Sequence, residues 1–367
     1  MNVYVLWFTA RSFRDLCATT QHALVMGLLE KSVHLALLNA DATIPLEHNG
    51  LTHVSLQNSS RRGFHASSLG KQMVAWLNNQ ETLHPNTIAI LDWRLAPHLI
   101  STLEKKHIRW VLMDRSPPAD RGLFGRLQWR SWKKAWKLTK QFNRTGFVVS
   151  ASHAAFVKQK IGSVNTVILP AGVDLDMFKP EQKKSRFTMV YHGRLDRHRG
   201  VLAAVMLLVK ARQSGIDVQL TLIGEGDAVP VLKKYSHEVE GIELLGKLEQ
   251  SEVASILGKC HVGLLTMPAT KVWRLASPLK RSEYLAAGLQ VLGIDHEGHR
   301  LPDGEEEWLH LFPQANFLEH ALSFLEAASQ HHDSAGERAR AYAEQHLGWT
   351  TSTERLLYTL ENESKTS

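Results

Sequence analysis

Short apolar runs of strand length alternate with helical patterns along both halves of the chain, and this alternation restricts the possible folds more than any other feature. The runs occupy residues 3–8, 33–38, 88–91, 110–113 and 147–150, then residues 188–191, 218–223 and 262–265. Strands separated by helical segments form βαβ units, whose strands lie parallel with helices covering the sheet. The sequence therefore predicts an α/β protein with parallel sheets.

The length of the chain, 367 residues, predicts two domains, because a single hydrophobic core rarely grows beyond about 250–300 residues. A stretch with two prolines and a glycine, residues 169–180, is typical of a linker. We expect Rossmann-like, doubly wound domains over residues 1–170 and 171–345, followed by a closing helix over residues 346–367. Such sheets bind ligands at the carboxyl ends of their strands. Two facing domains would place the functional site in the cleft between them.

The net charge of +7 predicts attraction to an anionic partner, and charge alone does not choose between a phosphate-bearing substrate, a membrane surface and nucleic acid. No stretch approaches the ~20 consecutive apolar residues of a membrane-spanning helix. The first ten residues lack the basic flank and cleavage site of a signal peptide, so we expect a strand there. Cys17 and Cys260 are far apart and outside any zinc-ligand spacing, which favours a reducing cytoplasm.

The first candidate binding element is Tyr191-His-Gly-Arg-Leu-Asp-Arg-His-Arg-Gly200, which follows a predicted strand and precedes a helix expected from about Val201. Gly193 permits a tight turn of the backbone. Arg194 and Arg199 place two permanent positive charges beside a helix N-terminus, as a pyrophosphate site requires. On its own, a solvated arginine-rich turn explains this segment equally well.

The second candidate element is the helix start at Ser277, Pro278, Leu279 and Lys280. Serine suits the N-cap and proline the first turn, so the free backbone amides there would face an anion. Lys280 adds positive charge, and Glu283, about one turn further, could accept hydrogen bonds from ribose hydroxyls. Alternatively, Glu283 only favours its own helix dipole. The two elements together favour a nucleotide-sugar site.

Several segments, in this order, resemble the donor domain of family four retaining glycosyltransferases, which have the GT-B fold. They are residues 169–180, 191–200, 222–227, 244–248, 277–291 and 346–360. The resemblance implies that Arg194, Arg199 and Glu283 are catalytic and that the closing helix crosses back onto the first domain. It also implies a donor-binding site made of Gly193, Arg194, Arg199, Gly224, Lys247, Leu248, Ser277, Pro278, Leu279, Lys280 and Glu283.

The chain departs from that family in places. Leu275 stands where the family often has a first glutamate, eight positions before Glu283, which leaves the contacts to the transferred sugar open. Residues 9–13 replace the family's Gly-rich loop. No histidine ends the run at residues 88–91, so the family's usual catalytic histidine has no counterpart.

Acidic residues at two other strand ends are candidate substitutes for that histidine. Asp92 and Arg94 follow one predicted strand, and Asp114 and Arg115 follow another. Asp114 begins a Pro-rich stretch, residues 114–120, with the composition of an acceptor-side loop. The alternative for Asp114 is a turn aspartate satisfied by its own loop.

Residues 124–144 predict an unusual helix. Basic residues recur at alternating spacings of four and three and form one positive stripe: Arg126, Arg130, Lys133, Lys137, Lys140 and Arg144. Beside the stripe are Trp129, Trp132 and Trp136, and a neighbouring face with Leu127, Ala135, Leu138 and Phe142 could pack on the sheet. Tryptophan beside cations suits the headgroup zone of an anionic membrane. The alternative is a sheet-covering helix with a solvated basic face. Nucleic acid could use the same charges and aromatic residues, but no nucleic-acid-binding motif accompanies them.

Other motifs argue against bound cofactors. Gly224-Glu-Gly-Asp227 has Val229 in place of the third glycine of a dinucleotide-binding loop, and no GxxxxGK[ST] phosphate loop occurs. Asp174-Leu-Asp176 has the DxD pattern of some metal sites but lies in the predicted linker. We therefore expect no cofactor and no metal, with the nucleotide sugar as the donor substrate.

Together these features predict a hexosyltransferase that uses a UDP- or GDP-sugar and a hydroxyl of a glycan or lipid-linked acceptor, in the synthesis of surface polysaccharide or glycolipid. Arg194, Arg199 and Lys280 would neutralise the leaving diphosphate; the family resemblance alone implies retention at the anomeric carbon. We expect a cytoplasmic protein, peripheral on the inner face of the cell membrane. Two alternatives stay open: a nucleotide-sugar epimerase or phosphorylase on this scaffold, and a non-catalytic partner subunit that binds glycan or membrane.

Overall fold

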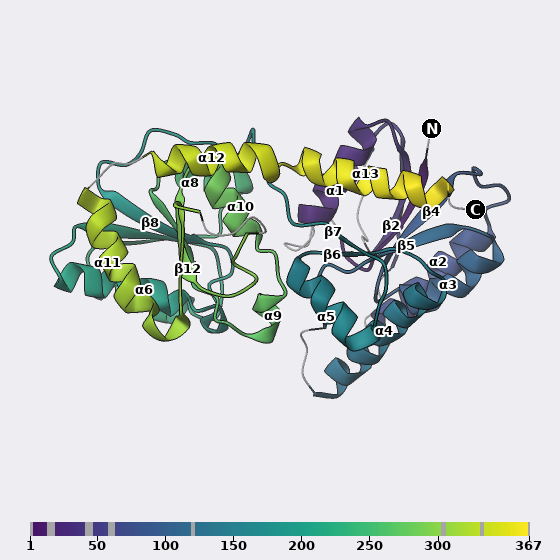
Figure 1. Ribbon diagram of the computed structural model, residues 1–367, viewed down its shortest axis with the longest axis horizontal. Helices are drawn as coiled ribbons and strands as arrows, with labels where there is room; N and C mark the ends of the chain where they lie inside the picture. Colours follow the sequence, from purple (N-terminus) through teal and green to yellow (C-terminus); the bar gives the residue numbers. More distant parts are fainter. Residues whose placement is uncertain are drawn as a thin grey trace. The chain divides into compact units, whose positions relative to one another are not determined.

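The computed structural model describes residues 3–12, 19–40, 47–57, 63–118, 122–301, 306–330 and 334–365. The chain divides into two compact units (Figure 1). Unit 1 comprises Met1–Pro170 together with Trp349–Ser367, and unit 2 comprises Ala171–Gly348. Phe13, Cys17 and Asp120, which the sequence analysis considered, lie outside the described residues.

Unit 1 is built on a seven-stranded parallel sheet with the order β3-β2-β1-β4-β5-β6-β7. The strands are β1 (Tyr4–Phe8), β2 (His34–Asn39), β3 (Leu51–Ser55), β4 (Thr87–Asp92), β5 (Arg109–Met113), β6 (Gly146–Val148) and β7 (Thr166–Ile168). Every residue of β4 is buried. Because helices cover both faces of a parallel sheet, a central strand needs the continuous apolar run that this segment has.

The helices of unit 1 cover both faces of its sheet. They are α1 (Thr19–Glu30), α2 (His65–Asn78), α3 (Ala96–Lys105), α4 (Gly122–Gln141), α5 (Ala151–Ile161) and α13 (Trp349–Lys365). Helices α1 and α13 lie on one face, and α2 to α5 on the other (Figure 1). Leu356 and Leu360 of α13 belong to the same buried cluster as Val5 and Trp7 of β1, so the C-terminal helix is part of the core of unit 1.

Unit 2 is built on a six-stranded parallel sheet with the order β10-β9-β8-β11-β12-β13. Its strands are β8 (Phe187–His192), β9 (Val218–Ile223), β10 (Ile242–Gly246), β11 (Val262–Leu265), β12 (Gln290–Ile294) and β13 (Leu309–Phe312). Its helices are η1 (Arg197–Arg199), α6 (Val201–Gln213), α7 (Val229–Glu238), α8 (Gln250–Gly258), α9 (Lys271–Arg274), α10 (Leu279–Ala286), η2 (Gln314–Asn316), α11 (Phe317–Gln330) and α12 (Ala335–His346). Separate buried clusters fill the two sides of this sheet.

The strand orders confirm the predicted class, because both sheets are doubly wound. In unit 1 the first strand, β1, lies between β2 and β4, and in unit 2 the first strand, β8, lies between β9 and β11. The chain reverses its direction of winding at these points. Doubly wound sheets bind their ligands beside the carboxyl ends of the strands at such a switch point. The end of β8 is therefore the place to look for a site in unit 2, and the end of β1 in unit 1.

Candidate functional site

The loops that follow β8 and β9 are joined through their backbones. The amide of Gly193 donates to the carbonyl of Ile223 over 2.9 Å, and the amide of Leu195 donates to the carbonyl of Glu225 over 2.8 Å. Gly224 has φ +132°, and a Cβ there would overlap the carbonyl oxygen of Gly193. The glycines that begin like a dinucleotide-binding loop therefore allow two strand ends to approach closely, which fixes the arginine loop against β9.

The two predicted arginines share one carboxylate. Arg194 binds Asp196 through Nη2 to Oδ1 at 3.0 Å and Nε to Oδ2 at 3.2 Å, and Arg199 Nε lies 3.5 Å from Oδ2. Burial acts to raise the pKa of Asp196, but the hydrogen bonds from Arg194 hold this pKa below its ordinary value. Arg194 is thus already paired and largely exposed, whereas Arg199 stacks on Trp273, with its Cζ 4.8 Å from the ring centroid. The two side chains are therefore not equivalent.

Lys280 is a buried cation at the start of α10. Its Nζ lies 3.8 Å from the ring centroid of Tyr191 and makes no hydrogen bond with any described residue. Burial lowers the pKa of Lys280 to about 7; the charge of Arg199 acts in the same direction, and that of Glu283 opposes it. A lysine held without a hydrogen-bond acceptor beside an arginine is stabilised in its charged form when an anion binds.

Glu283 pairs with a histidine that the sequence analysis did not single out. His192 ends β8, and its Nε2 lies 3.2 Å from Glu283 Oε2; both side chains are almost buried. The neighbouring Tyr284 packs its ring where a Cβ on Gly263 of β11 would be, and it accepts a hydrogen bond from the His192 amide over 3.4 Å. The contact with β11 holds α10 close to the sheet and brings the carboxylate to the end of β8.

Unsatisfied polar atoms gather in this region. In the part of unit 2 that the structure describes, the buried side-chain polar atoms without a hydrogen-bond partner are His192 Nε2, Arg199 Nε, Lys280 Nζ, Arg281 Nε and His299 Nε2. The first two lie within ion-pair distance of a carboxylate but do not form a hydrogen bond with it. All are nitrogens of basic side chains. Buried polar groups in proteins normally have partners, so this concentration of nitrogens beside one switch point favours an anionic ligand.

A histidine pair adds to this region. His296 and His299, after β12, have ring centroids 3.7 Å apart, and burial together with His296 lowers the pKa of His299 well below its ordinary value. Lys280 and Arg281 contribute in the same direction. Nothing in the spacing of these histidines in the sequence predicts that they lie near Lys280.

The helix start differs in detail from the prediction. Pro278, not Ser277, is the N-cap residue of α10, and no side chain caps it. Ser277 Oγ instead accepts a hydrogen bond from the backbone amide of Ala171 over 3.4 Å. Leu275, which stands where a glutamate is common in the resembling family, is buried. Leu279 follows the cap as the first helical residue, so Lys280 lies in the first turn of the helix, as predicted.

The turn after β10, which carries the predicted donor-binding residues Lys247 and Leu248, lies at the same edge of the sheet. The amide of Gly224 donates to the carbonyl of Gly246 over 2.7 Å, which ties the end of β10 to the end of β9. Lys247, the next residue, is exposed, and Leu248 is partly buried. The aspartates of the DxD motif form a turn instead, because Asp174 Oδ1 accepts hydrogen bonds from the amides of the residues two and three positions later.

Asp114, a catalytic candidate in the sequence analysis, lies in the interior of unit 1. Its side chain is completely buried, and its Oδ2 accepts hydrogen bonds from Trp132 Nε1 at 2.6 Å and Trp136 Nε1 at 2.8 Å. His153 Nε2 lies 3.2 Å from the same oxygen. Burial acts to raise the pKa of Asp114, but His153 and the two indoles together hold it below its ordinary value. Asp92 is nearly buried and pairs with Arg94.

The same contacts correct the predicted membrane face of α4. Trp132 and Trp136 are fully buried, with Ala135 and Thr139 on the same packed face, whereas Leu127 is 47% exposed. Trp129 is partly buried and packs edge-to-face on Trp132. The tryptophans turn inward because Asp114 offers their N–H groups a buried acceptor.

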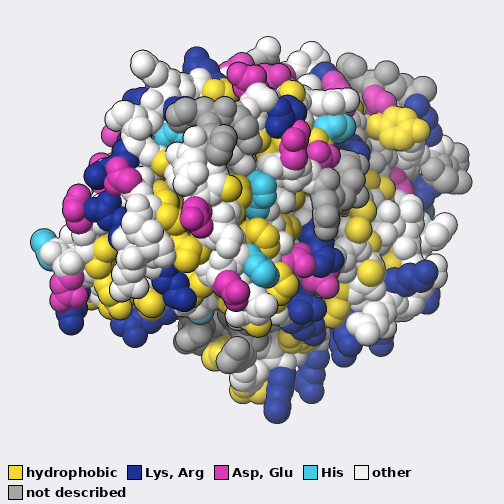
Figure 2. Space-filling view, turned by 60° about the vertical axis from the view of Figure 1, so that its left-hand side comes forward, with side chains coloured by type: hydrophobic (Ala, Val, Ile, Leu, Met, Phe, Trp, Pro, Cys, Tyr) yellow, Lys and Arg dark blue, Asp and Glu magenta, His cyan; other side chains and the backbone are white. Residues whose placement is uncertain are grey.

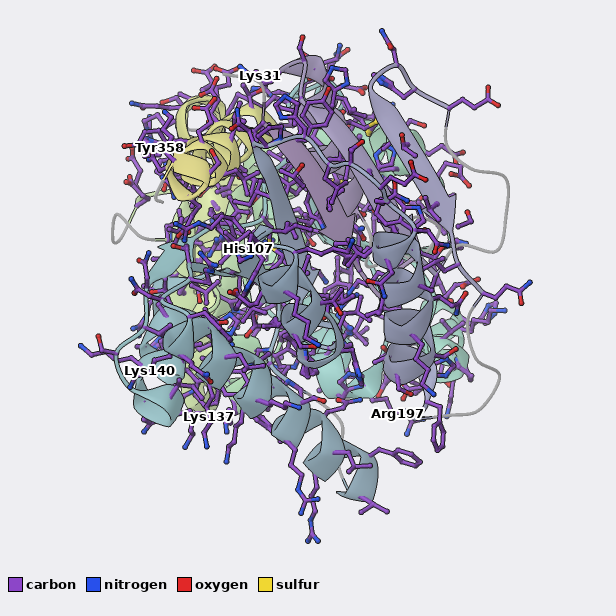
Figure 3. All side chains as sticks on the ribbon, turned by 90° about the vertical axis from the view of Figure 1, so that its right-hand side faces the viewer. Lys31, His107, Lys137, Lys140, Arg197 and Tyr358 are labelled. Atoms are coloured by element: carbon purple, nitrogen blue, oxygen red, sulfur yellow. The ribbon has the colours of Figure 1, made fainter. Side chains whose placement is uncertain are left out.

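The basic stripe itself is exposed over most of its length. The exposed cations of α4 are Arg126, Arg130, Lys133, Lys134, Lys137 and Lys140, and the helix contains no acidic residue. Lys137 and Lys140 point outward from the ribbon in Figure 3. Arg144, predicted to extend the stripe, is buried and pairs with Glu104. Over the face shown in Figure 2, basic and acidic side chains are interspersed. Because α4 has exposed cations and no acidic residue, it is a local concentration of positive charge.

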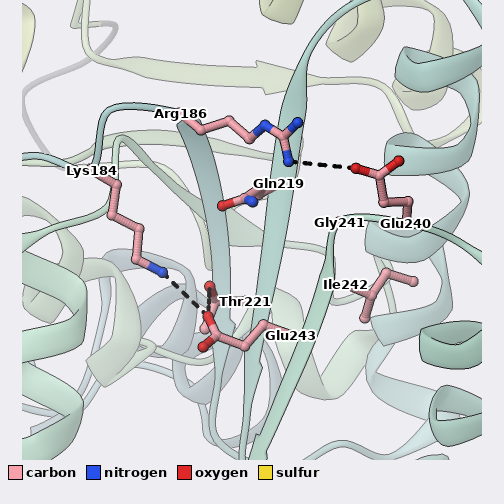
Figure 4. Close-up of a pocket in the computed structure, with 8 residues that line it drawn as sticks. All are labelled: Lys184, Arg186, Gln219, Thr221, Glu240, Gly241, Ile242 and Glu243. Carbon is pink, nitrogen blue, oxygen red and sulfur yellow. Dashed lines mark hydrogen bonds and ion pairs between the residues drawn. The ribbon is translucent and has the colours of Figure 1, made fainter.

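A hollow of about 410 Å³ lies at the opposite, amino-terminal edge of the unit 2 strands (Figure 4). Its charged side chains neutralise one another: Lys184 pairs with Glu243, and Arg186 with Glu240. The hollow therefore lacks the uncompensated positive charge that distinguishes the carboxyl edge. Among the helices with described residues, none is both long and apolar enough to cross a membrane.

Solved structures with the same architecture match the whole chain. Sucrose-phosphate synthase from Thermosynechococcus elongatus superposes with a TM-score of 0.79 at 15% identity, over 100% of each chain. Alr3699/HepE of Anabaena, solved in complex with UDP-glucose, superposes with a TM-score of 0.71 at 12% identity, over 98% of this chain and 100% of that one. The chain has the GT-B fold. At these identities the GT-B likeness concerns the fold alone.

Sequence comparison gives a weaker likeness. No protein-family model matches the chain. The GDP-mannose-dependent alpha-(1-6)-phosphatidylinositol dimannoside mannosyltransferase of Mycobacterium tuberculosis (strain ATCC 25177 / H37Ra) is 24% identical over 204 residues, which cover 51% of this chain and 52% of the relative. The chain thus spans about half the length of the curated relatives it matches.

Proposed function

We propose that the protein is a glycosyltransferase that takes a hexosyl group from a UDP- or GDP-sugar bound to unit 2. The observation that carries this proposal is the buried Lys280, whose Nζ makes no hydrogen bond with the described residues, beside Arg199 and Glu283 at the switch point of the sheet. Its support includes the GT-B fold and the likeness to a mannosyltransferase named as GDP-mannose-dependent. Alr3699/HepE, of the same fold, was solved with UDP-glucose.

In the proposed reaction, Lys280 and Arg199 neutralise the negative charge that grows on the diphosphate as its bond to the anomeric carbon breaks. A hydroxyl of the glycan or lipid-linked acceptor forms the new bond to that carbon as the bond to the diphosphate breaks, and its proton passes to the leaving diphosphate. Glu283, oriented by His192, binds the ribose hydroxyls. Since these cations supply the compensating charge, we propose a metal-independent reaction, with retention at the anomeric carbon as in the resembling family.

The remaining donor contacts follow the same edge of unit 2. We propose that Gly193 and Gly224 let the diphosphate approach the backbone, that Lys247 and Leu248 lie beside the nucleotide base, and that the start of α10 binds phosphate. The residues at the start of α10 that would bind phosphate are Ser277, Pro278 and Leu279. Arg194 would lie at the exposed side of the site.

Replacing Arg199 or Glu283 by alanine should lower transfer by about two orders of magnitude, since each variant removes a charged contact to the donor. The measurement is release of UDP or GDP from a panel of sugar nucleotides with and without lipid and glycan acceptors. Arg197→Ala is the matched control, because Arg197 lies in the same short helix with an exposed side chain. Wild-type protein that releases neither nucleotide with any donor would favour the non-catalytic partner subunit instead. Isomerised sugar nucleotide with no transfer product would indicate an epimerase.

We also propose that the exposed cations of α4 hold the protein on the anionic, cytoplasmic face of a membrane, where a lipid-linked acceptor would be found. Leu123 is 70% exposed and Leu127 47% exposed at the start of the same helix. Apolar side chains next to a cationic face are typical of helices that lie in a membrane interface. In this proposal Leu123 and Leu127, and not the tryptophans, are the apolar residues that contact the membrane.

Vesicle sedimentation tests this contact. Each lysine near an anionic surface is worth about 1 kcal/mol, so Lys133→Gln with Lys137→Gln should lower partition onto phosphatidylglycerol vesicles by roughly thirtyfold. The control is Lys233→Gln with Lys234→Gln on α7, which makes the same change of charge on exposed residues of unit 2. Equal binding of both double variants, or equal binding to neutral phosphatidylcholine, would contradict the proposal.

A further inference from the structure

Arginines follow neighbouring strands of unit 1 at the same distance. Phe8, Leu91 and Leu112 are partners in register across β1, β4 and β5. Each of them is followed, at the third position after it, by an arginine: Arg11, Arg94 and Arg115. Because the strands are parallel and adjacent, the arginines leave the sheet at one level of its carboxyl edge. The sequence analysis noted two of them but not the common register.

This edge is the switch point of unit 1, between β1 and β4. The two carboxylates at these strand ends, Asp92 and Asp114, already have partners. Asp92 Oδ2 lies 3.1 Å from Arg94 Nη1, and Asp114 is buried and bound by two indoles and His153. Among the described residues, Arg11 and Arg115 have no carboxylate partner. Positive charge therefore accumulates at a place where doubly wound sheets bind ligands.

Arg11 and Arg115 are close enough to affect each other. Burial lowers the pKa of Arg115 to about 10, and the positive charge of Arg11 acts in the same direction. Arg115 Nη1 donates to the carbonyl of Leu169, which anchors the guanidinium at the end of β7. Two guanidinium groups that repel each other at a partly buried site are stabilised by an anion that accepts hydrogen bonds from both.

We infer that Arg11 and Arg115 bind an oxyanion, a phosphate or a carboxylate, at the carboxyl edge of the unit 1 sheet. The oxyanion has two possible sources: an anionic group of the acceptor, or the diphosphate of the sugar nucleotide. Only this choice of source rests on the proposed function. The binding itself depends on the arginines alone and is measurable without turnover.

The experiment measures binding of inorganic phosphate to the full chain by calorimetry, in a Lys280→Met background that removes the buried cation of unit 2. We expect phosphate to bind this variant. The additional change Arg11→Gln should weaken it at least about tenfold, the usual effect of losing a hydrogen bond to a charged group. Arg109→Gln is the matched control, because Arg109 begins β5 at the opposite edge and its loss changes the net charge equally. Equal phosphate affinity for Arg11→Gln and Arg109→Gln would overturn the inference.

Two further measurements test the need for the guanidinium group and identify the source of the oxyanion. Arg11→Lys should recover part of the phosphate affinity, since it restores the charge without the guanidinium fork. With Lys280 intact, weaker binding of UDP and GDP to Arg11→Gln would assign the site to the donor diphosphate. Unchanged UDP and GDP binding, with phosphate binding lost in the Lys280→Met background, would assign it to an anionic acceptor.

Discussion

The variant Lys280→Met is expected to lose at least about a hundredfold in the rate of sugar transfer, the effect of removing one preorganised group that stabilises transition-state charge. Lys280 Nζ lies over the ring of Tyr191 and makes no hydrogen bond with the described residues, so the hydrogen bonds at stake are those to the ligand. Methionine fills a similar volume without the charge. The measurement is kcat and KM with the sugar nucleotide that the wild-type protein uses fastest.

The free energy of unfolding shows whether Lys280→Met loses activity through a lost ligand contact or through a damaged fold. Lys280 has a folded pKa of about 7, below the value of about 10.4 for a lysine in an unfolded chain. Between these values the unfolded chain binds more protons, so this residue makes the free energy of unfolding rise with pH. Lys280→Met should remove that rise and be at least as stable as wild type at neutral pH. Lys210→Met, on the exposed end of α6, is the control and should keep wild-type activity.

The same pKa predicts proton uptake. At pH 8 most Lys280 side chains are neutral, and a bound diphosphate favours the charged form, so binding should take up about one proton per nucleotide. Calorimetry in two buffers with different ionisation heats measures this number. Affinity for UDP or GDP should fall as the pH rises above 7. Proton uptake that persists in Lys280→Met would assign the effect to another group.

The variant Asp114→Ala is expected to lower the free energy of unfolding by about 3–5 kcal/mol, the range for breaking a buried ion pair. It leaves the N–H groups of Trp132 and Trp136 and the ring of His153 without their common acceptor. Urea unfolding followed by circular dichroism measures the loss. Asp114→Asn keeps an acceptor oxygen but not the charge, so its free energy of unfolding should lie between those of the wild type and Asp114→Ala.

Asp92→Ala provides the comparison at the neighbouring strand end. Asp92 pairs with Arg94, a partly exposed residue that water can solvate after the change, so the loss should be nearer 1 kcal/mol. If Asp114→Ala kept wild-type stability and lost only activity, the carboxylate would be a reacting group after all, as the sequence analysis first supposed.

Sequence patterns predicted the central strands well. The runs at residues 218–223 and 262–265 coincide with β9 and β11, and residues 88–91 lie within β4. These strands are almost entirely buried, so apolar residues predominate in each, although β9 also contains Gln219 and Thr221. The predicted runs did not include β3, β7, β10, β12 and β13. Of these, β3 and β10 are only partly buried, and their polar residues interrupt the apolar run.

For the candidate site, sequence patterns predicted the elements but not the partners. The arginine loop and the start of α10 were recognised from glycine, proline and charge, which act over a few residues. The pairing of His192 with Glu283 was not expected, because it depends on which helix packs beside the end of β8. The pairing of Arg194 with Asp196 is local, within one loop, and was not expected either.

The helix α4 shows most clearly which features follow from local sequence and which depend on the tertiary structure. The spacing of its cations determined a positive stripe, because side chains three and four residues apart share one face of any helix. Which face its tryptophans take was decided by Asp114, which lies 18 and 22 residues earlier in the sequence and is brought beneath the helix by β5. Local periodicity thus fixes what lies together on an element. Only the folded sheet decides what that element packs against, because the partners come from distant parts of the chain.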